Sequence, residues 1–117
     1  MTARILVVED EFFIAQEIVD TLNHAGFEVL GPCPTVAKAL VQLENTPCDA
    51  AILDVSLRNE TSLPVVQALG NRGIPFVILT GFSARQLPSE MTAAPVLTKP
   101  MQAEVLIREL HKLLPND

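Results

Sequence analysis

Short apolar runs alternate with helical patterns along this chain of 117 residues, and this alternation strongly limits what it can fold into. Five runs have the length and apolar character of buried strands: residues 4–8, 27–30, 50–53, 75–79 and 96–98. Repeated strand–helix units favour a parallel sheet with right-handed crossovers and helices on both faces. We therefore predict an α/β fold with a doubly wound five-stranded parallel sheet.

Local signals place the helices between these strands. Apolar residues spaced by four predict a first helix that Gly26 ends, and Thr35 can cap a second one. A third helix should begin at Ser62. Residues 82–95 are ambiguous, with a short helix expected near residues 83–86, so the fourth helix should be short or irregular. Residues 103–113 carry the pattern of the last helix.

Composition and charge exclude several classes of protein. Apolar residues make up 49% of the chain and charged residues 19%, which excludes a disordered chain. The apolar runs are far shorter than the ~20 residues of a membrane span, and no signal peptide pattern opens the sequence, so we expect a cytoplasmic protein. A net charge of −6 and the absence of Trp and Tyr argue against a nucleic-acid partner.

Polar residues follow four of the predicted strands where ligands bind in such sheets, beyond the carboxyl ends. Glu9 and Asp10 follow the first strand and Asp54 the third, while Thr80 and Lys99 end the fourth and fifth. In the strand order 2-1-3-4-5 the first and third strands are neighbours, so the three carboxylates should converge. Clustered carboxylates favour a hard cation, most plausibly Mg²⁺, and a cation opposite a lysine suits phosphoryl transfer.

Four segments give the chain a resemblance to the receiver domain of two-component response regulators. They are residues 7–11, 52–55, 79–81 and 98–100, in order and at matching separations. The resemblance covers nearly the whole chain and implies that residues 1–117 form one flavodoxin-like receiver domain of the stand-alone type. It also implies a phosphorylation-dependent signalling switch that acts through protein–protein contacts, with no activity beyond Mg²⁺-dependent self-phosphorylation and slow self-dephosphorylation.

The same resemblance assigns roles to individual residues. Asp54 would accept a phosphoryl group from a histidine kinase or a histidine phosphotransferase. Asp10 would bind Mg²⁺ directly, Glu9 would be the second acid, often acting through water, and Asp54 and the backbone carbonyl of Ser56 would complete the ligands. Thr80 would donate a hydrogen bond to the phosphoryl group. Lys99 would pair with it, and the Lys99–Pro100 peptide would be cis.

The sequence departs from the family pattern at several positions. Val96 stands where the family usually has an aromatic residue whose rotation reports the state of the strand-four hydroxyl. The segment between Thr80 and Lys99 is short, and residues 56–61 lack the usual glycine. Phe82 follows Thr80 by two residues and is expected near the path of an attacking water, which predicts a long-lived phosphoryl group.

Other readings remain open beside the switch. The chain could be a pseudo-receiver, a binding module that does not use phosphate, and Val96 favours this mildly. A metal-dependent hydrolase would need an acid or base two residues after Asp54, where Ser56 stands. The chain could also be a receiver cut from a larger regulator. Outside the site, we expect at least one of Phe12 and Phe13 in the core.

Overall fold

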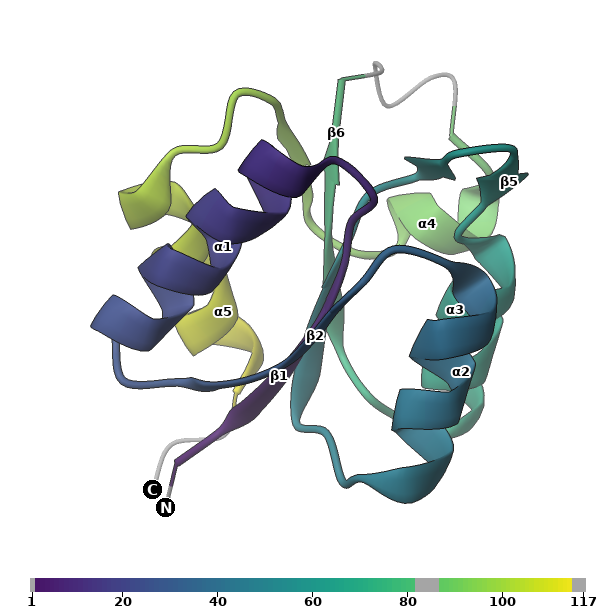
Figure 1. The fold of residues 1–117 in the computed structure, drawn as a ribbon, viewed down its shortest axis with the longest axis horizontal. Coiled ribbons are helices and arrows are strands. Elements are labelled where there is room, and N and C mark those ends of the chain that lie inside the picture. Colours follow the sequence, from purple (N-terminus) through teal and green to yellow (C-terminus); the bar gives the residue numbers. More distant parts are fainter. Residues whose placement is uncertain (1, 82–86, 115–117) are drawn as a thin grey trace.

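The protein forms a three-layer α/β sandwich around one parallel sheet (Figure 1). The structure is a computed structural model, and it describes residues 2–81 and 87–114. The sheet contains, in spatial order, β2 (Glu28–Cys33), β1 (Arg4–Val8), β3 (Ala50–Leu53), β6 (Phe76–Thr80) and β7 (Val96–Thr98). All four neighbouring pairs are parallel, which confirms the predicted strand order.

Helices cover both faces of the sheet (Figure 1). One face carries α1 (Phe12–His24) and α5 (Ala103–Leu113), and the other carries α2 (Val36–Asn45), α3 (Leu63–Asn71) and α4 (Ser89–Thr92). With four residues, α4 is the short fourth helix that the sequence predicts. No helix within residues 2–81 and 87–114 is both long and apolar enough to cross a membrane.

The central strands are buried on both sides because successive side chains point to opposite faces. In β1, Ile5 and Val7 belong to the core beneath α1 and α5, whereas Leu6 and Val8 belong to the core beneath α2, α3 and α4. This explains why the central strands read as continuous apolar runs rather than as alternating patterns.

The second strand is longer than the sequence predicts. We expected it to end at Leu30, before Gly31 and Pro32, but β2 continues through both to Cys33. The pairing with β1 shifts by one residue between Leu6 and Val8, which makes room for the extra residue. Because β2 is an edge strand, a proline that cannot donate a ladder hydrogen bond is tolerated there.

A small antiparallel hairpin, which the sequence did not predict, follows β3. It pairs β4 (Ser56–Leu57) with β5 (Glu60–Thr61). Asn59 in its turn has a φ of 64°, a conformation that asparagine tolerates better than most residues. Asparagine therefore fills the turn of a segment in which the sequence has no glycine.

Candidate functional site

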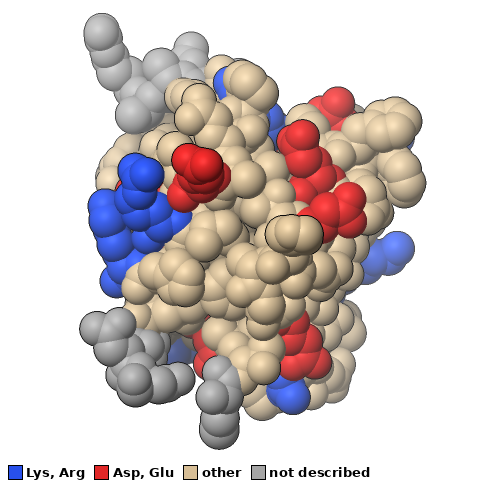
Figure 2. All heavy atoms as spheres, turned by 90° about the vertical axis from the view of Figure 1, so that its left-hand side faces the viewer, with Lys and Arg blue, Asp and Glu red and all other residues tan. Residues whose placement is uncertain are grey.

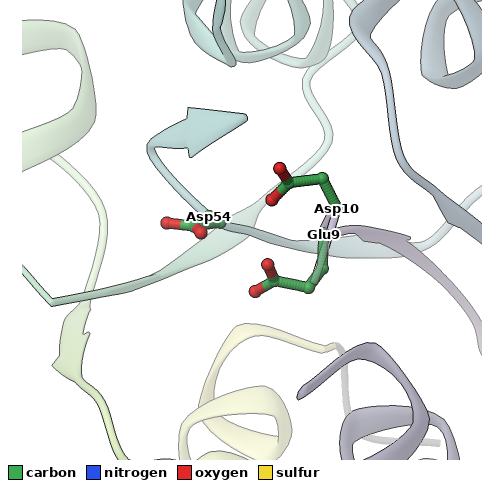
Figure 3. Close-up of side chains that lie close together, drawn as sticks. All are labelled: Glu9, Asp10 and Asp54. Atoms are coloured by element: carbon green, nitrogen blue, oxygen red, sulfur yellow. The ribbon is translucent and has the colours of Figure 1, made fainter. Parts of the chain in front are cut away.

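Three carboxylates meet at the carboxyl end of the sheet, as the sequence predicts (Figure 3). Glu9 and Asp10 directly follow β1, and Asp54 directly follows β3, its neighbour in the sheet. A hydrogen bond of 3.0 Å from the Asp54 backbone N–H to the Val8 carbonyl keeps the two strand ends together. One oxygen from each carboxylate lies within 4.8 Å of the other two. Glu9 and Asp54 are buried, with exposed fractions of 3% and 8%.

Lys99 reaches this cluster from the end of the edge strand β7. Its ammonium lies 2.9 Å from Oδ2 of Asp54 and 3.1 Å from Oε1 of Glu9. The Lys99 backbone N–H donates a hydrogen bond of 2.8 Å to the Thr80 carbonyl, which fixes the chain as it leaves the sheet. The Lys99–Pro100 peptide is cis, as the resemblance implies. The lysine thus neutralises two of the three acids at once.

Burial and charge change the acid–base behaviour of the cluster. Burial raises the pKa of Glu9 above its ordinary value, and the nearby charge of Asp54 raises it further, although a backbone hydrogen bond and Lys99 oppose this. Burial alone would lower the pKa of Lys99, but its contacts with Asp54 and Glu9 outweigh burial and raise that pKa. At neutral pH the lysine therefore stays charged and holds the cluster together.

Asp10 keeps its carboxylate available for a cation. Within the described part of the chain, no lysine, arginine or histidine nitrogen lies within 4 Å of its oxygens. Glu9 uses Oε2 to accept a hydrogen bond of 3.2 Å from the Glu11 N–H, which positions its other oxygen toward Lys99. A donor set made only of oxygens, with one acid unpaired, has the chemistry that Mg²⁺ prefers.

Thr80 and Ser56 lie where the sequence predicts. Thr80 is the last residue of β6 and is fully buried, and it is in register with Thr98, next to Lys99. Ser56 begins β4 two residues after Asp54 and is exposed. The structure thus brings Thr80 beside the lysine, and Ser56 follows Asp54 at the start of the short hairpin.

The departure at Val96 and two further predictions have different outcomes. Val96 is half-buried and packs against the core beneath α2, α3 and α4, so it serves as packing at the sheet edge. The expectation that Phe12 or Phe13 enters the core is wrong, because both are exposed on the first turn of α1. Phe82 and the helix expected near residues 83–86 lie outside the described residues.

The sequence analysis missed one contact that ties the site to a helix. Oε2 of Glu60, in β5, accepts a hydrogen bond of 3.0 Å from the Val36 N–H at the start of α2. The Thr35 side chain caps the same helix through the Lys38 N–H, as predicted. The hairpin after Asp54 therefore helps to cap α2, and no local pattern in residues 56–61 indicates this long-range partner.

The sheet order, the acidic cluster and the lysine define an α/β domain with an acidic site at the carboxyl edge of its sheet, and comparison with known proteins identifies the family. The sequence model of the response regulator receiver domain matches residues 5–111. The chain therefore belongs to the family of response regulator receiver domains of two-component systems. The general function of this family is that of a phosphorylation switch, and its members generally bind Mg²⁺ through acidic residues and interact with histidine kinases or phosphotransferases.

Individual relatives agree with this assignment. A probable transcriptional regulatory protein of Picosynechococcus is 34% identical over 96% of this chain and 49% of its own length. The two-component response regulator PhoP of Pseudomonas aeruginosa is 30% identical over 95% of this chain and 51% of its own. The chain thus spans about half the length of the curated relatives it matches.

Solved structures match the fold over whole chains. The solution structure of SdrG from Sphingomonas melonis Fr1 is 42% identical with a TM-score of 0.84, and the match covers 96% of both chains. The chemotaxis response regulator CheY4 of Vibrio cholerae is 28% identical, also with a TM-score of 0.84, over 97% of this chain and all of that one.

Proposed function

We propose that residues 1–117 form a cytoplasmic signalling switch that accepts a phosphoryl group on Asp54 from a histidine kinase or histidine phosphotransferase. The switch would act through protein–protein contacts, with no nucleic-acid or membrane partner. The observation that carries this proposal is the placement of Asp54 between Lys99, at 2.9 Å, and an acid pair whose oxygens lie within 4.8 Å. Phosphoryl transfer needs such a site, because catalysis depends on positioning and on neutralising charge.

The reaction can be followed on the residues of this chain. A carboxylate oxygen of Asp54 attacks the phosphorus of a phosphohistidine, a P–O bond forms, and the P–N bond breaks. The imidazole nitrogen leaves with the electron pair of the P–N bond and takes up a proton from solvent. An acyl phosphate remains on Asp54. Lys99 already contacts Asp54 Oδ2, so its ammonium can pair with the new phosphoryl oxygens. The Thr80 hydroxyl would donate a hydrogen bond to another of them.

The metal ligands in this proposal are Asp10, Glu9, Asp54 and the backbone carbonyl of Ser56. A bound Mg²⁺ would neutralise negative charge on the phosphoryl oxygens. Asp10 would bind the ion directly because its carboxylate has no cationic partner among the described residues. Glu9 would act through water, since one of its oxygens pairs with Lys99 and the other accepts the Glu11 N–H.

Intact-mass analysis after incubation with acetyl phosphate and Mg²⁺ tests the proposal. We expect one added phosphoryl group on the wild-type chain, none when EDTA replaces Mg²⁺, and none on Asp54→Asn. Asp49→Asn is the matched control, because Asp49 precedes β3 and accepts a hydrogen bond from the Arg4 N–H at the opposite end of the strand. A wild-type chain that stays unmodified would instead support a binding module that does not use phosphate. Phosphorylation of Asp54→Asn at the wild-type level would show that another residue is the acceptor.

A further inference from the structure

The short hairpin after Asp54 is connected both to the acidic site and to α2. Its first strand, β4, begins at Ser56, two residues after Asp54, and its second strand, β5, carries Glu60. Leu57 lies opposite Glu60 in the pairing of the two strands. One short element therefore carries the backbone carbonyl proposed as a metal ligand at its start and a carboxylate that caps a helix near its end.

The hairpin is held as a unit rather than as a loose loop. The Ser62 N–H donates a hydrogen bond of 2.9 Å to the Val55 carbonyl, which closes the segment at its base. Val55 and Leu57 are 6% and 4% exposed, and both belong to the core beneath α2, α3 and α4. A change in position at Ser56 should therefore be passed on to Glu60, because closely packed side chains leave the two strands little freedom to move separately.

Glu60 supplies part of the cap of α2 from a distant segment, at the top of α2 and α3 in Figure 1. The first turn of a helix has backbone N–H groups without partners inside the helix. The Thr35 hydroxyl accepts a hydrogen bond from the Lys38 N–H, and this part of the cap is local. Oε2 of Glu60 accepts a hydrogen bond of 3.0 Å from the Val36 N–H. The first turn of α2 has no acid of its own, so this carboxylate also places a negative charge at the positive end of the helix dipole.

We propose that Mg²⁺ binding at the acidic site and capping of α2 by Glu60 strengthen each other through this hairpin. The inference rests on the proposed function, in which Asp54 and the Ser56 carbonyl are metal ligands. When these groups hold the ion, the start of the hairpin is fixed, and a fixed hairpin keeps the Glu60 carboxylate at the Val36 N–H. The effect is reciprocal, because a cap that is favoured by the bound ion must favour binding of the ion by the same factor. The state of the site is thereby conveyed to α2, on the sheet face opposite α1 and α5.

NMR of the amide groups of the 117-residue chain, titrated with Mg²⁺, tests this coupling. We expect the Mg²⁺ dissociation constant of Glu60→Ala to exceed that of wild type by about threefold to fivefold, the upper value being the full contribution of a typical cap. In wild type, saturating Mg²⁺ should slow exchange of the Val36 N–H by a similar factor relative to the first turn of α5. In Glu60→Ala this additional protection should be absent.

Thr35→Val is the matched control for the stability of the helix. It removes the local cap of the same helix and leaves the hairpin unchanged. It should speed amide exchange in the first turn of α2 and yet leave the Mg²⁺ dissociation constant at the wild-type value.

Glu60→Gln separates the hydrogen bond from charge. Figure 2 shows most of the acidic side chains of its view in the upper part, toward the carboxyl edge of the sheet. Loss of an acid near this edge weakens cation binding through charge alone. Glu60→Gln loses the same charge as Glu60→Ala but keeps an oxygen that can accept the Val36 N–H. Its dissociation constant should therefore stay within about twofold of the wild-type value.

Three results would overturn the proposal. Equal dissociation constants for wild type and Glu60→Ala would show that the hairpin does not couple its two ends. Equal weakening in Glu60→Ala and Glu60→Gln would assign the effect to charge. Equal weakening in Glu60→Ala and Thr35→Val would mean that the stability of α2, and not the position of the hairpin, sets the affinity. A wild-type chain that binds no Mg²⁺ would reject the proposed function itself, and the coupling with it.

Discussion

Replacing Asp54 with asparagine should stabilise the metal-free protein, because the change removes one negative charge from a crowded acidic site. At 4.8 Å and an effective dielectric constant near 20, Asp54 is repelled by each of the other two carboxylates by about 3.5 kcal/mol. On the same scale, its contact with Lys99 at 2.9 Å contributes about 5.7 kcal/mol of attraction. Repulsion of about 7 kcal/mol thus slightly exceeds attraction.

The variant also keeps part of the attraction. The asparagine oxygen can still accept a hydrogen bond from Lys99, and Lys99 keeps its ion pair with Glu9. We therefore expect the free energy of unfolding of Asp54→Asn to rise by about 1 to 3 kcal/mol in EDTA at neutral pH. For a domain of this size the melting temperature should rise by about 4 °C or more.

The assay is a set of melting curves for wild type and Asp54→Asn, each in EDTA and in Mg²⁺. A Mg²⁺ ion that binds only the folded state should stabilise the wild type by about 2.7 kcal/mol when its concentration is 100 times the dissociation constant. Because the proposed site uses Asp54 as a ligand, the variant should gain less. Asp49→Asn, at the other end of β3, should show neither effect.

The pH dependence of the difference has a definite sign. The folded pKa of Glu9 lies above its ordinary value of 4.5, mainly because of burial and further because of the charge of Asp54. Its charge therefore costs stability at neutral pH, and this cost fades as the pH falls through the raised pKa toward 4.5. The advantage of Asp54→Asn should shrink over the same range. A metal-free Asp54→Asn protein that melts below wild type would refute this account, because it would mean that Lys99 and other partners stabilise the Asp54 charge overall.

Three further changes test other parts of the structure. Lys99→Met should lower the free energy of unfolding by about 3 kcal/mol at neutral pH, because it leaves buried carboxylates unpaired. The folded pKa of Lys99 is raised above 10.5, so the stability that wild type has over Lys99→Met should be full below pH 10.5. It should be lost as the pH rises through the raised pKa, which urea unfolding across alkaline pH would check. Glu60→Ala removes the cap on the Val36 N–H and should cost about 1 kcal/mol, with faster amide exchange in the first turn of α2; unchanged exchange there would contradict the capping role. Gly31→Ala should cost about 2 kcal/mol or more, because φ is 104° and the new Cβ would lie 2.7 Å from a backbone nitrogen, whereas Gly70→Ala, with nothing within 4 Å, should be neutral or stabilising in the same denaturation series.

Much of the fold and the geometry of the site could be predicted from the sequence, for a physical reason. Parallel strands buried on both faces produce continuous apolar runs, and their carboxyl ends share one edge, so Glu9, Asp10 and Asp54 had to meet once the strand order was known. Lys99 ends the edge strand at the same side of the sheet.

The features that could not be predicted depend on contacts between distant segments. The Glu60 bond to α2 joins residues 24 positions apart, and no local pattern announces it. The passage of β2 through Gly31 and Pro32 depends on the register shift with β1 and on its place at the sheet edge. The exposure of Phe12 and Phe13 contradicts the general tendency of aromatic residues to be buried. The buried residues of α1 are Ala15, Ile18 and Leu22, so the helix packs on the sheet through a part of its surface that includes neither ring.

The ion pairs of Lys99 with the acids can form only when the whole sheet has folded. Its partners Glu9 and Asp54 are supplied by strands far apart in the chain, and Lys99 itself follows β7, a strand of three residues at the sheet edge. A chain emerging from the ribosome would already hold both acids before the lysine is synthesised, and until β7 docks the cluster would lack its main counter-charge. Nascent or truncated chains that end before residue 99 would carry an acidic edge that attracts free cations but cannot retain the ordered ion pairs. The Lys99 contacts can therefore form only after β1, β3 and β7 have all taken their places in the sheet.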